Sequence, residues 1–289
     1  MKIVTDSGTD LSLTREQISA LDIHVVPLSV TLEGKTYREG VDMERDEFYR
    51  LLAATPSFPK TSQPSAGDFA AVYKKLAATD PDILSIHMSS GLSGTLNAAL
   101  TAAEMVPEAN VTLVDTKTLS TAAGWQVEAA ARAVKAGWLK EKILTLMASI
   151  SASTETLYTL KDLKYLIHGG RISQLKGLLA SVLDLKPLIG VEKEKGTYVQ
   201  RGQVRTFQKA LEGLVDLMAR QHSPQSPLRV QVMHALNPEG ADILHQLIDK
   251  KFKCTWLPTG NLSIVLGAHT GISMVGIAYA PLAAFAAIP

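Results

Sequence analysis

Hydroxyl-rich segments follow three short apolar runs in the first half of the chain, and a fourth segment precedes a predicted helix. They are residues 6–10 (DSGTD), 60–65 (KTSQPS), 89–95 (SSGLSGT) and 115–120 (DTKTLS). Hydroxyls and glycine N–H groups near a helix N-terminus can bind an anion without a cationic side chain. The same residue types also form ordinary caps and turns. Together the segments predict a polar anion site, provided that the fold gathers them at one edge of a sheet.

Ser93 and His269 are also the candidate nucleophile and base of a serine hydrolase. Segment 91–95 misses the spacing of a nucleophile elbow by one residue. A hydrolase also needs an acid that orients the histidine, for which Asp6 or Asp115 is available. A lone histidine between uncharged runs is more often a hydrogen-bonded core residue than a catalyst. Serine-dependent hydrolysis of a lipid or ester therefore stays open as the alternative function.

Other patterns argue against nucleotide and metal sites. Segment 91–94 lacks the lysine of a phosphate-binding loop. The seven histidines are scattered without paired ligand spacing, and one cysteine, Cys254, excludes an intrachain disulfide and a multi-cysteine zinc site. We therefore expect no metal and no cofactor.

Composition narrows the class of protein further. The chain has 289 residues and a formal net charge of +1, which argues against a strongly basic nucleic-acid binder and an acidic disordered tail. Its length fits one large or two medium domains. The single cysteine and the polar N-terminus, which does not resemble a signal peptide, predict a cytoplasmic protein.

An uncharged stretch runs from residue 261 to the end of the chain. Its glycines, His269 and Pro281 interrupt it, so two buried strands at 263–266 and 273–279 fit better than a membrane-spanning helix. We therefore expect no stable membrane insertion. The last residues, 282–288, fit either a short packed helix or a mobile tail.

The apolar pattern predicts an α/β protein with two domains, 1–153 and 154–289. In the first, strands at 2–5, 83–88 and 111–114 alternate with helices at 14–20, 95–105 and 122–136, which favours a parallel-sheet α/β/α domain. A strand at 24–32 and a hairpin to 35–37 form a small β excursion near 28–40, and further helices are expected at 46–54, 66–77 and 139–149. The second mixes strands and helices, as in a two-layer α+β domain. Its helices are expected at 163–168, 177–183, 206–221 and 239–252, and its strands at 188–191, 197–199, 229–233 and 255–257.

The ordered set of short motifs resembles the DegV family of bacterial fatty-acid-binding proteins. The resemblance covers nearly the whole chain, roughly residues 1–279. The motifs are TDS at 5–7, TSQPS at 61–65, SSGLSGT at 89–95, DT at 115–116, YL at 165–166, GGRI at 169–172, KP at 186–187, RT at 205–206, KA at 209–210, HA at 234–235 and GAHTG at 267–271. Residues 271–273 (GIS) depart from the more usual Gly-Pro-Gly, which puts the orientation of His269 in doubt.

The resemblance implies one long-chain fatty acid bound at the domain interface, without a catalytic centre of the protein's own. It further implies that the protein is the acyl-carrying subunit of fatty acid kinase. A separate ATP-dependent subunit would convert the fatty acid to an acyl phosphate for phospholipid synthesis. By the same resemblance, the carboxylate contacts are Thr61, Ser62, Ser93 and His269. Arg171, Arg205 and Lys209 are candidate supporting or partner-docking charges.

A fatty acid needs a long apolar tunnel with a small polar end. Burying about 14 methylenes gives roughly 11 kcal/mol before the cost of association, so the tail alone can support tight binding. Candidate tunnel walls are Leu178, Leu179, Val182, Leu183, Leu188, Ile189, Ile264, Val265 and Met274, each of which also fits an ordinary core. A regulatory or structural protein that binds lipid only incidentally is a third possibility.

Overall fold

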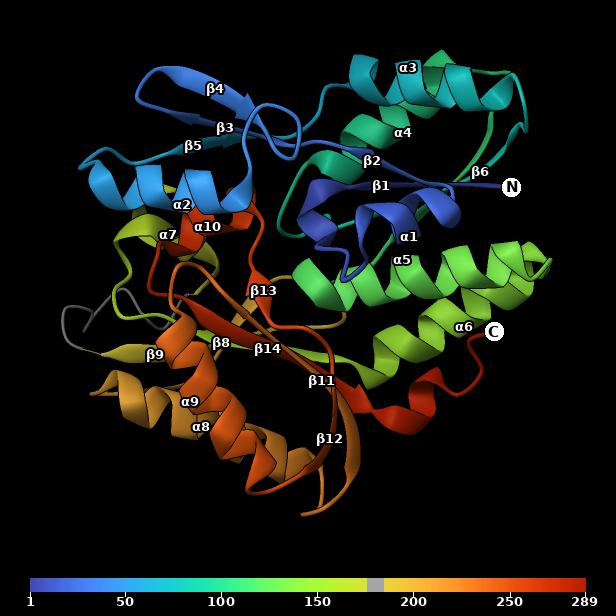
Figure 1. Ribbon diagram of the computed structural model, residues 1–289. Coiled ribbons are helices and arrows are strands. Elements are labelled where there is room, and N and C mark those ends of the chain that lie inside the picture. The colour runs from blue at the N-terminus through green and yellow to red at the C-terminus, as the bar shows by residue number, and fades with distance from the viewer. Residues whose placement is uncertain (176–184) are drawn as a thin grey trace.

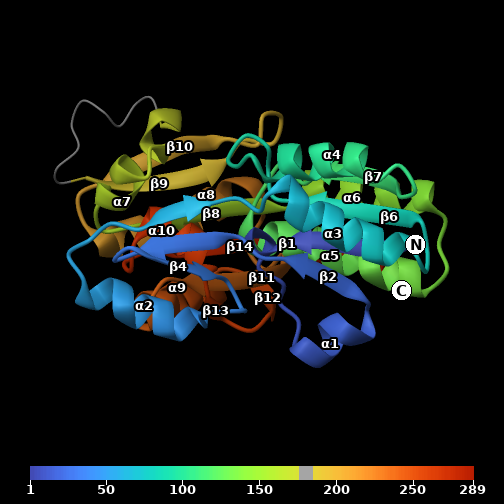
Figure 2. The same cartoon turned by 90° about the horizontal axis from the view of Figure 1, so that it is seen from above.

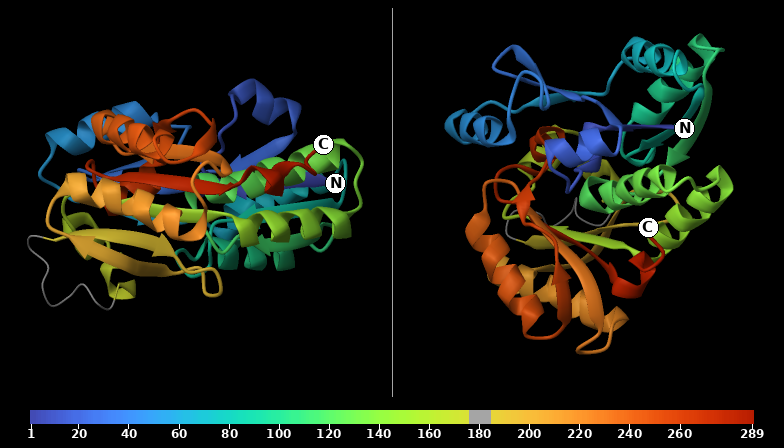
Figure 3. Two further views of the ribbon diagram at one scale, coloured as in Figure 1. Left: turned by 90° about the horizontal axis from the view of Figure 1, so that it is seen from below. Right: turned by 45° about the vertical axis from the view of Figure 1, so that its right-hand side comes forward.

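The computed structural model describes residues 1–175 and 185–289. Within them the chain forms three β-sheets with helices packed around the sheets (Figure 1). Figures 2 and 3 show both chain termini on the same side of the molecule. The expected helix at 177–183 lies outside the described residues.

The first sheet is parallel, with the strand order β2-β1-β6-β7. The strands are β1 (Lys2–Asp6), β2 (Ile23–Val26), β6 (Asp82–His87) and β7 (Asn110–Asp115), and α1 (Arg15–Ala20) joins the first two. Its covering helices are α3 (Ala66–Ala77), α4 (Thr95–Met105), α5 (Ser120–Lys135) and α6 (Lys140–Ser153). Val4 and Ile83 pack with α3 and α4, whereas Ile3 and Leu84 pack with α5 and α6. Apolar side chains on both faces of the strands thus require two helical layers, and the predicted parallel α/β/α arrangement is confirmed.

A small antiparallel sheet is inserted between β2 and α3. It has the order β4-β3-β5 and comprises β3 (Ser29–Leu32), β4 (Lys35–Arg38) and β5 (Lys60–Ser62), with α2 (Arg45–Ala54) between β4 and β5 in the chain. The predicted hairpin is confirmed, with Glu33 and Gly34 both at positive φ, as its two-residue turn requires. The prediction of a loop at 60–65 was wrong for its first three residues. Prolines on both sides and polar residues within the segment are typical of a loop. The strand forms because it pairs with β3, a long-range contact that the local sequence does not show.

The third sheet is mixed and has the order β10-β9-β8-β14-β11-β12, with β13 beside β11. Its strands are β8 (Glu155–Thr159), β9 (Lys186–Val191), β10 (Tyr198–Val204), β11 (Pro227–His234), β12 (Lys253–Trp256), β13 (Gly260–Asn261) and β14 (Val275–Pro281). Helices α8 (Phe207–Gln221) and α9 (Pro238–Asp249) cover one face through a shared apolar core. The other face turns toward the N-terminal half, and α7 (Lys164–His168) lies near its edge (Figure 1).

The expected strand at 263–266 is a helix, α10 (Ile264–Thr270). Every residue of α10 is buried, so its apolar run carries no helical periodicity and resembles a buried strand. Ser263 marks the true start, because its hydroxyl accepts the Leu266 N–H at 3.3 Å as an N-cap. This correction matters because α10 carries His269.

The C-terminal residues pack on the body of the molecule. Leu282–Phe285 forms a 3-10 turn, and Phe285 meets Trp125 edge-on with ring centroids 5.3 Å apart. Of the two alternatives for this segment, the packed short helix is therefore correct. Across the two described ranges, no helix combines the length and the apolar character that a membrane crossing needs.

Candidate functional site

A polar cavity of about 100 Å³ lies where the small sheet, α10 and the loop after β6 meet. Thr61, Gln63, Ser93, Arg171 and His269 contribute polar or charged side chains to its wall, and most of the other lining residues are apolar. The described lining residues are Leu28, Thr61, Gln63, Met88, Leu92, Ser93, Gly94, Arg171, Tyr198, Val265, Leu266 and His269. Two of the four hydroxyl-rich segments, 60–65 and 89–95, therefore meet here.

Thr61 and His269 form the centre of this cavity. The Thr61 Oγ1 atom lies 2.8 Å from His269 Nε2. Burial, with a smaller contribution from the charge of Arg171, lowers the pKa of His269 to about 3. The imidazole is therefore neutral at physiological pH.

The neutral imidazole orients the threonine hydroxyl. His269 Nδ1 is buried and has no hydrogen-bond partner among the described residues. A proton on Nδ1 would leave a buried donor unsatisfied, so the Nε2–H tautomer is favoured and donates to Thr61 Oγ1. The Thr61 hydroxyl hydrogen is then free to donate to a ligand in the cavity.

Local geometry brings His269 close to α7. A side chain at Gly169 would collide with His269 Nδ1, so only glycine permits this approach. At the end of α10, Gly271 has a φ of +72° and lies against the ring of Tyr165, where a side chain would be both strained and crowded. The departure at 271–273 thus keeps the glycine that the turn requires.

Ser93 faces the cavity from the turn that precedes α4. Its Oγ accepts the Thr95 N–H at 3.3 Å and lies 2.8 Å from Thr95 Oγ1. If the Thr95 hydroxyl is the donor in that pair, the Ser93 hydrogen is free for a ligand. Gly94 lies against the Gln63 amide, which would have to move if residue 94 carried a side chain. The Ser93 hydroxyl and the Gln63 amide therefore line the same small cavity, although they come from two distant segments of the chain.

The structure corrects the prediction for Ser62. Side chains alternate along β5, so Thr61 points inward while its neighbours Lys60 and Ser62 are exposed. Ser62 does not line the cavity. The sequence did not reveal this alternation because the segment was interpreted as a loop.

Basic residues divide into two groups. Arg171 lines the cavity and donates from Nη1 to the Gly169 carbonyl at 2.7 Å. Arg205 and Lys209 are exposed around the start of α8 and do not line it. Of these three predicted basic residues, Arg171 is therefore the one placed to act on a ligand in this cavity.

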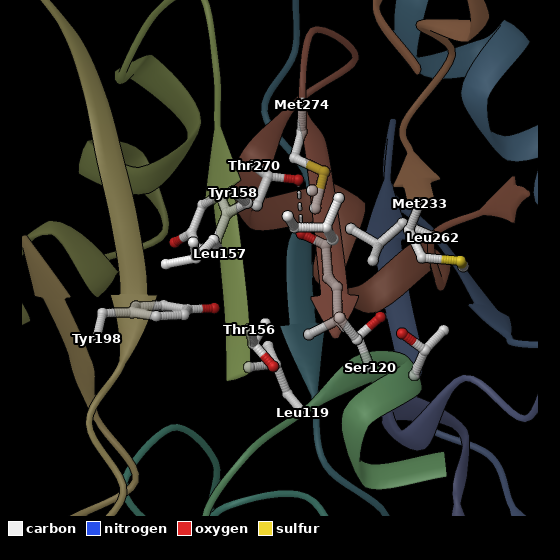
Figure 4. A pocket seen from close by; sticks show the side chains of 15 residues that line it. Leu119, Ser120, Thr156, Leu157, Tyr158, Tyr198, Met233, Leu262, Thr270 and Met274 are labelled. Atoms are coloured by element: carbon white, nitrogen blue, oxygen red, sulfur yellow. Dashed lines mark hydrogen bonds between the residues drawn. The ribbon is translucent and has the colours of Figure 1, made fainter. Parts of the chain in front are cut away.

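An apolar cavity of about 30 Å³ adjoins the polar one and shares Tyr198 and Leu266 with it. Figure 4 shows Tyr158 and Tyr198 on one side and Met233 and Leu262 on the other. The remaining described lining residues are Leu119, Ser120, Thr121, Thr156, Leu157, Thr270, Met274, Gly276, Ile277 and Ala278.

Two of the hydroxyl groups around this cavity are engaged by protein acceptors, whereas the buried Tyr158 hydroxyl has no hydrogen-bond partner among the described residues. Ser120 donates to Asp10 at 2.6 Å, and Thr270 donates to the Leu266 carbonyl at 3.1 Å. Among the predicted tunnel residues, Met274 lines this cavity and Val265 lines the polar one. Leu188, Ile189 and Ile264 belong to packed cores, and Leu178, Leu179, Val182 and Leu183 lie outside the described residues.

A small polar cavity thus lies beside an apolar one, and the two share Tyr198 and Leu266. The family model described as "Uncharacterised protein, DegV family" matches residues 1–282. The chain belongs to the DegV family. A DegV domain-containing protein of Deinococcus radiodurans is 34% identical over 279 residues, which cover 96% of this chain and 95% of that protein.

Solved structures of DegV proteins share the fold over nearly the full length. One shows the fatty acid binding of a DegV family protein from Thermus thermophilus, with a TM-score of 0.86, 29% identity and coverage of 97% of this chain and 99% of that chain. Another is DegV of Bacillus subtilis, a fatty acid binding protein, with a TM-score of 0.86, 29% identity and coverage of 96% and 98%. Fatty acid binding is thus a property of DegV family proteins.

The geometry of this DegV chain does not assemble a serine hydrolase. Ser93 Oγ pairs with Thr95 and His269 Nε2 pairs with Thr61, so the two candidate catalytic groups are not hydrogen-bonded to each other. Of the side chains that the structure describes, no carboxylate orients His269 Nδ1. The arrangement required for proton transfer between serine and histidine is therefore not formed by these residues.

Sequence reasoning missed Gln63 and Tyr198 as site residues. Gln63 lies within a segment that had been selected for its hydroxyls, so its inclusion in the TSQPS motif was a usable signal. Tyr198 follows a glycine turn in a hairpin, where an aromatic residue is typical of any strand. Its place between the two cavities depends on how the third sheet meets α10.

Proposed function

We propose that this protein binds one long-chain fatty acid, with the carboxylate in the polar cavity and the tail in the apolar cavity. The observation that carries the proposal is the pair of hydroxyls, Thr61 and Ser93, beside a neutral His269, at one end of an apolar interior. Two solved DegV relatives at 29% identity are fatty acid binding proteins. The hydrolase alternative lacks a comparable observation.

The head-group site suits an anion that must stay reactive. Thr61 and Ser93 each supply one neutral donor, and the Gln63 amide can supply another. Arg171 contributes positive charge from the wall, while its Nη1 is held by the Gly169 carbonyl. A carboxylate bound mainly by neutral donors keeps more of its nucleophilic character than one locked in a bidentate pair with arginine.

The tail must displace side chains to enter. About 30 Å³ has room for little more than two water molecules, which is far less than an alkyl chain needs. Met233 and Met274 are unbranched and adaptable, so they are the side chains best suited to make room. Desolvation of the tail supplies roughly 0.8 kcal/mol per methylene toward this rearrangement.

The protein then acts as a carrier without catalytic chemistry of its own. We propose that it presents the carboxylate to a separate ATP-dependent kinase subunit in the cytoplasm, which forms the acyl phosphate used in phospholipid synthesis. The exposed Arg205 and Lys209 are the proposed docking charges for that subunit. The fatty acid would lie between the proposed domains 1–153 and 154–289.

The decisive experiment combines ligand identification with matched variants. Native mass spectrometry of the protein purified from bacteria should show an adduct with the mass of a fatty acid. Thr61→Ala and Ser93→Ala should each weaken fatty acid binding by about 1.5–3 kcal/mol, because a buried carboxylate loses a donor. Ser62→Ala is the matched control on the exposed side of β5 and should leave the affinity unchanged.

Two results would overturn the proposal. One is equal affinity of Thr61→Ala, Ser93→Ala and wild type for oleate. The other is a stoichiometric acyl burst with p-nitrophenyl esters that Ser93→Ala removes, which would establish the hydrolase instead. If a cognate kinase subunit yields no acyl phosphate from ATP, oleate and this protein, only the proposed partnership with a kinase is overturned.

A further inference from the structure

A buried ion cluster lies at the opposite end of α10 from His269. The Arg45 guanidinium contacts Asp10 through Nη2 at 2.8 Å and Glu39 through Nε at 3.1 Å. The side chains of Asp10 and Glu39 are only 1% and 4% exposed. One arginine from α2 is thus shared between two carboxylates from different loops.

The cluster holds the backbone that leads into α10. Arg45 Nη1 donates to the Asn261 carbonyl at 2.7 Å, and Glu39 Oε1 accepts the Ile264 N–H at 3.2 Å. Tyr49, one helical turn after Arg45, donates to the Leu262 carbonyl at 3.0 Å. Three side chains therefore hydrogen-bond to the backbone at three of the four residues 261–264.

The same inserted substructure holds both ends of α10. Glu39 accepts the N–H of its first residue, Ile264, and Arg45 holds the Asn261 carbonyl just before the helix, whereas Thr61 of β5 meets His269 near its last residue. α10 also packs along α2, β3 and β5. His269 is five residues after Ile264, about 7.5 Å along the helix axis, so a shift at the start of the helix moves the imidazole.

We propose that Glu39 and Arg45 are positioning residues for the head-group site, which fix α10 so that His269 stays in hydrogen-bond distance of Thr61. This inference rests on the proposed function of that site. Glu39 and Arg45 do not line the polar cavity, so they act on the ligand only through α10.

The electrostatic surroundings of Glu39 favour a role in positioning α10 over a role in stabilising the fold. Arg45 and Tyr49 from α2 and Asp10 from the loop after β1 are the charged or titratable groups around Glu39, and α10 contributes backbone there. Glu39 Oε2 lacks a hydrogen-bond partner within the described part of the chain. Buried ion clusters can often be replaced by apolar residues without loss of stability. Directional ionic contacts, in contrast, can hold a helix such as α10 at one position along its axis.

A double-mutant cycle tests the inference. Dissociation constants for oleate are measured for wild type, Glu39→Gln, His269→Ala and the double variant. Glu39→Gln should weaken binding about tenfold in the wild-type background and less than about twofold in the His269→Ala background. Glu44→Gln is the matched control, because Glu44 adjoins Arg45 but is 66% exposed and pairs with the exposed Arg15.

The outcomes separate the inference from the proposed function. An equal loss in both backgrounds, or no loss at all, would overturn the positioning role while leaving the fatty acid site intact. Unchanged affinity in both His269→Ala and Thr61→Ala would instead overturn the site itself. Should Glu39→Gln not fold, Glu39→Asp replaces it in the cycle, because it keeps the charge and shortens the reach by one methylene.

Discussion

The two ends of α10 use buried polar groups in opposite ways. At its C-terminal end, a neutral imidazole and a hydroxyl face a cavity and keep hydrogen-bonding capacity for a ligand. At its N-terminal end, the polar groups are the ionisable side chains of Arg45, Asp10 and Glu39. They form ion pairs with each other and hydrogen bonds with the backbone. Ionic contacts thus hold the start of the helix, while neutral polar groups near its end face a cavity, as the proposed binding role requires.

The largest expected effect comes from removing the central cation. Arg45→Met leaves two buried carboxylates without a counter-charge and should lower the free energy of unfolding by about 3–5 kcal/mol. Urea denaturation at pH 7.5 measures this loss. Arg15→Met, which removes an exposed guanidinium, is the control and should change stability by less than about 1 kcal/mol. Similar values for the two variants would contradict the contrast between the ends of α10.

A pH series separates the two ends through Glu39. Burial, opposed by Arg45, raises the pKa of Glu39 from 4.5 to about 7. The folded state therefore binds this proton more tightly than the unfolded state, and the contribution to stability is lost as the pH rises from about 4.5 to 7. The free energy of unfolding of wild type relative to Glu39→Gln should fall by roughly 2–3 kcal/mol across that window. A constant difference would show that Glu39 does not titrate there.

His269 should give the opposite slope. Its pKa is lowered from 6.5 to about 3, so the unfolded state takes up this proton first and stability is lost as the pH falls below 6.5. Wild type relative to His269→Asn should lose roughly 2 kcal/mol of unfolding free energy between pH 6.5 and 5. Opposite slopes for Glu39→Gln and His269→Asn confirm the comparison, and equal slopes contradict it.

The smallest effect tests the approach of α10 to α7. Gly169→Ala places a methyl group against His269 Nδ1 and should weaken oleate binding by about 1 kcal/mol through displacement of the ring. Gly67→Ala in α3 is the control, because a side chain there meets only ordinary contact. Unchanged affinity in Gly169→Ala would mean that the imidazole can move without loss of its bond to Thr61.

The sequence predicted the scaffold well because apolar runs and caps are local signals. The helices α3 and α4 begin and end where their patterns do, and Ser65 caps α3. It also selected Thr61, Ser93 and His269 through family motifs. It could not reveal the outward turn of Ser62, since that depends on pairing between β5 and β3.

The ion cluster was beyond sequence reasoning for a different reason. Asp10 lies in a hydroxyl-rich segment that was predicted to bind an anion, whereas Glu39 and Arg45 lie in charged segments that fit a solvated surface. Only the packing of α2 against α10 buries them together. Likewise, α10 has no polar face that would distinguish a buried helix from a buried strand.

The segment between Val26 and Ala66 supplies Thr61, Glu39 and Arg45, yet no strand of the parallel sheet belongs to it. One continuous stretch that leaves the parallel sheet and returns to it therefore carries three of the twelve described residues that line the polar cavity, Leu28, Thr61 and Gln63. None of the described residues that line the apolar cavity comes from this stretch, so exchanging it between relatives would alter the polar end of the site and leave the apolar wall unchanged.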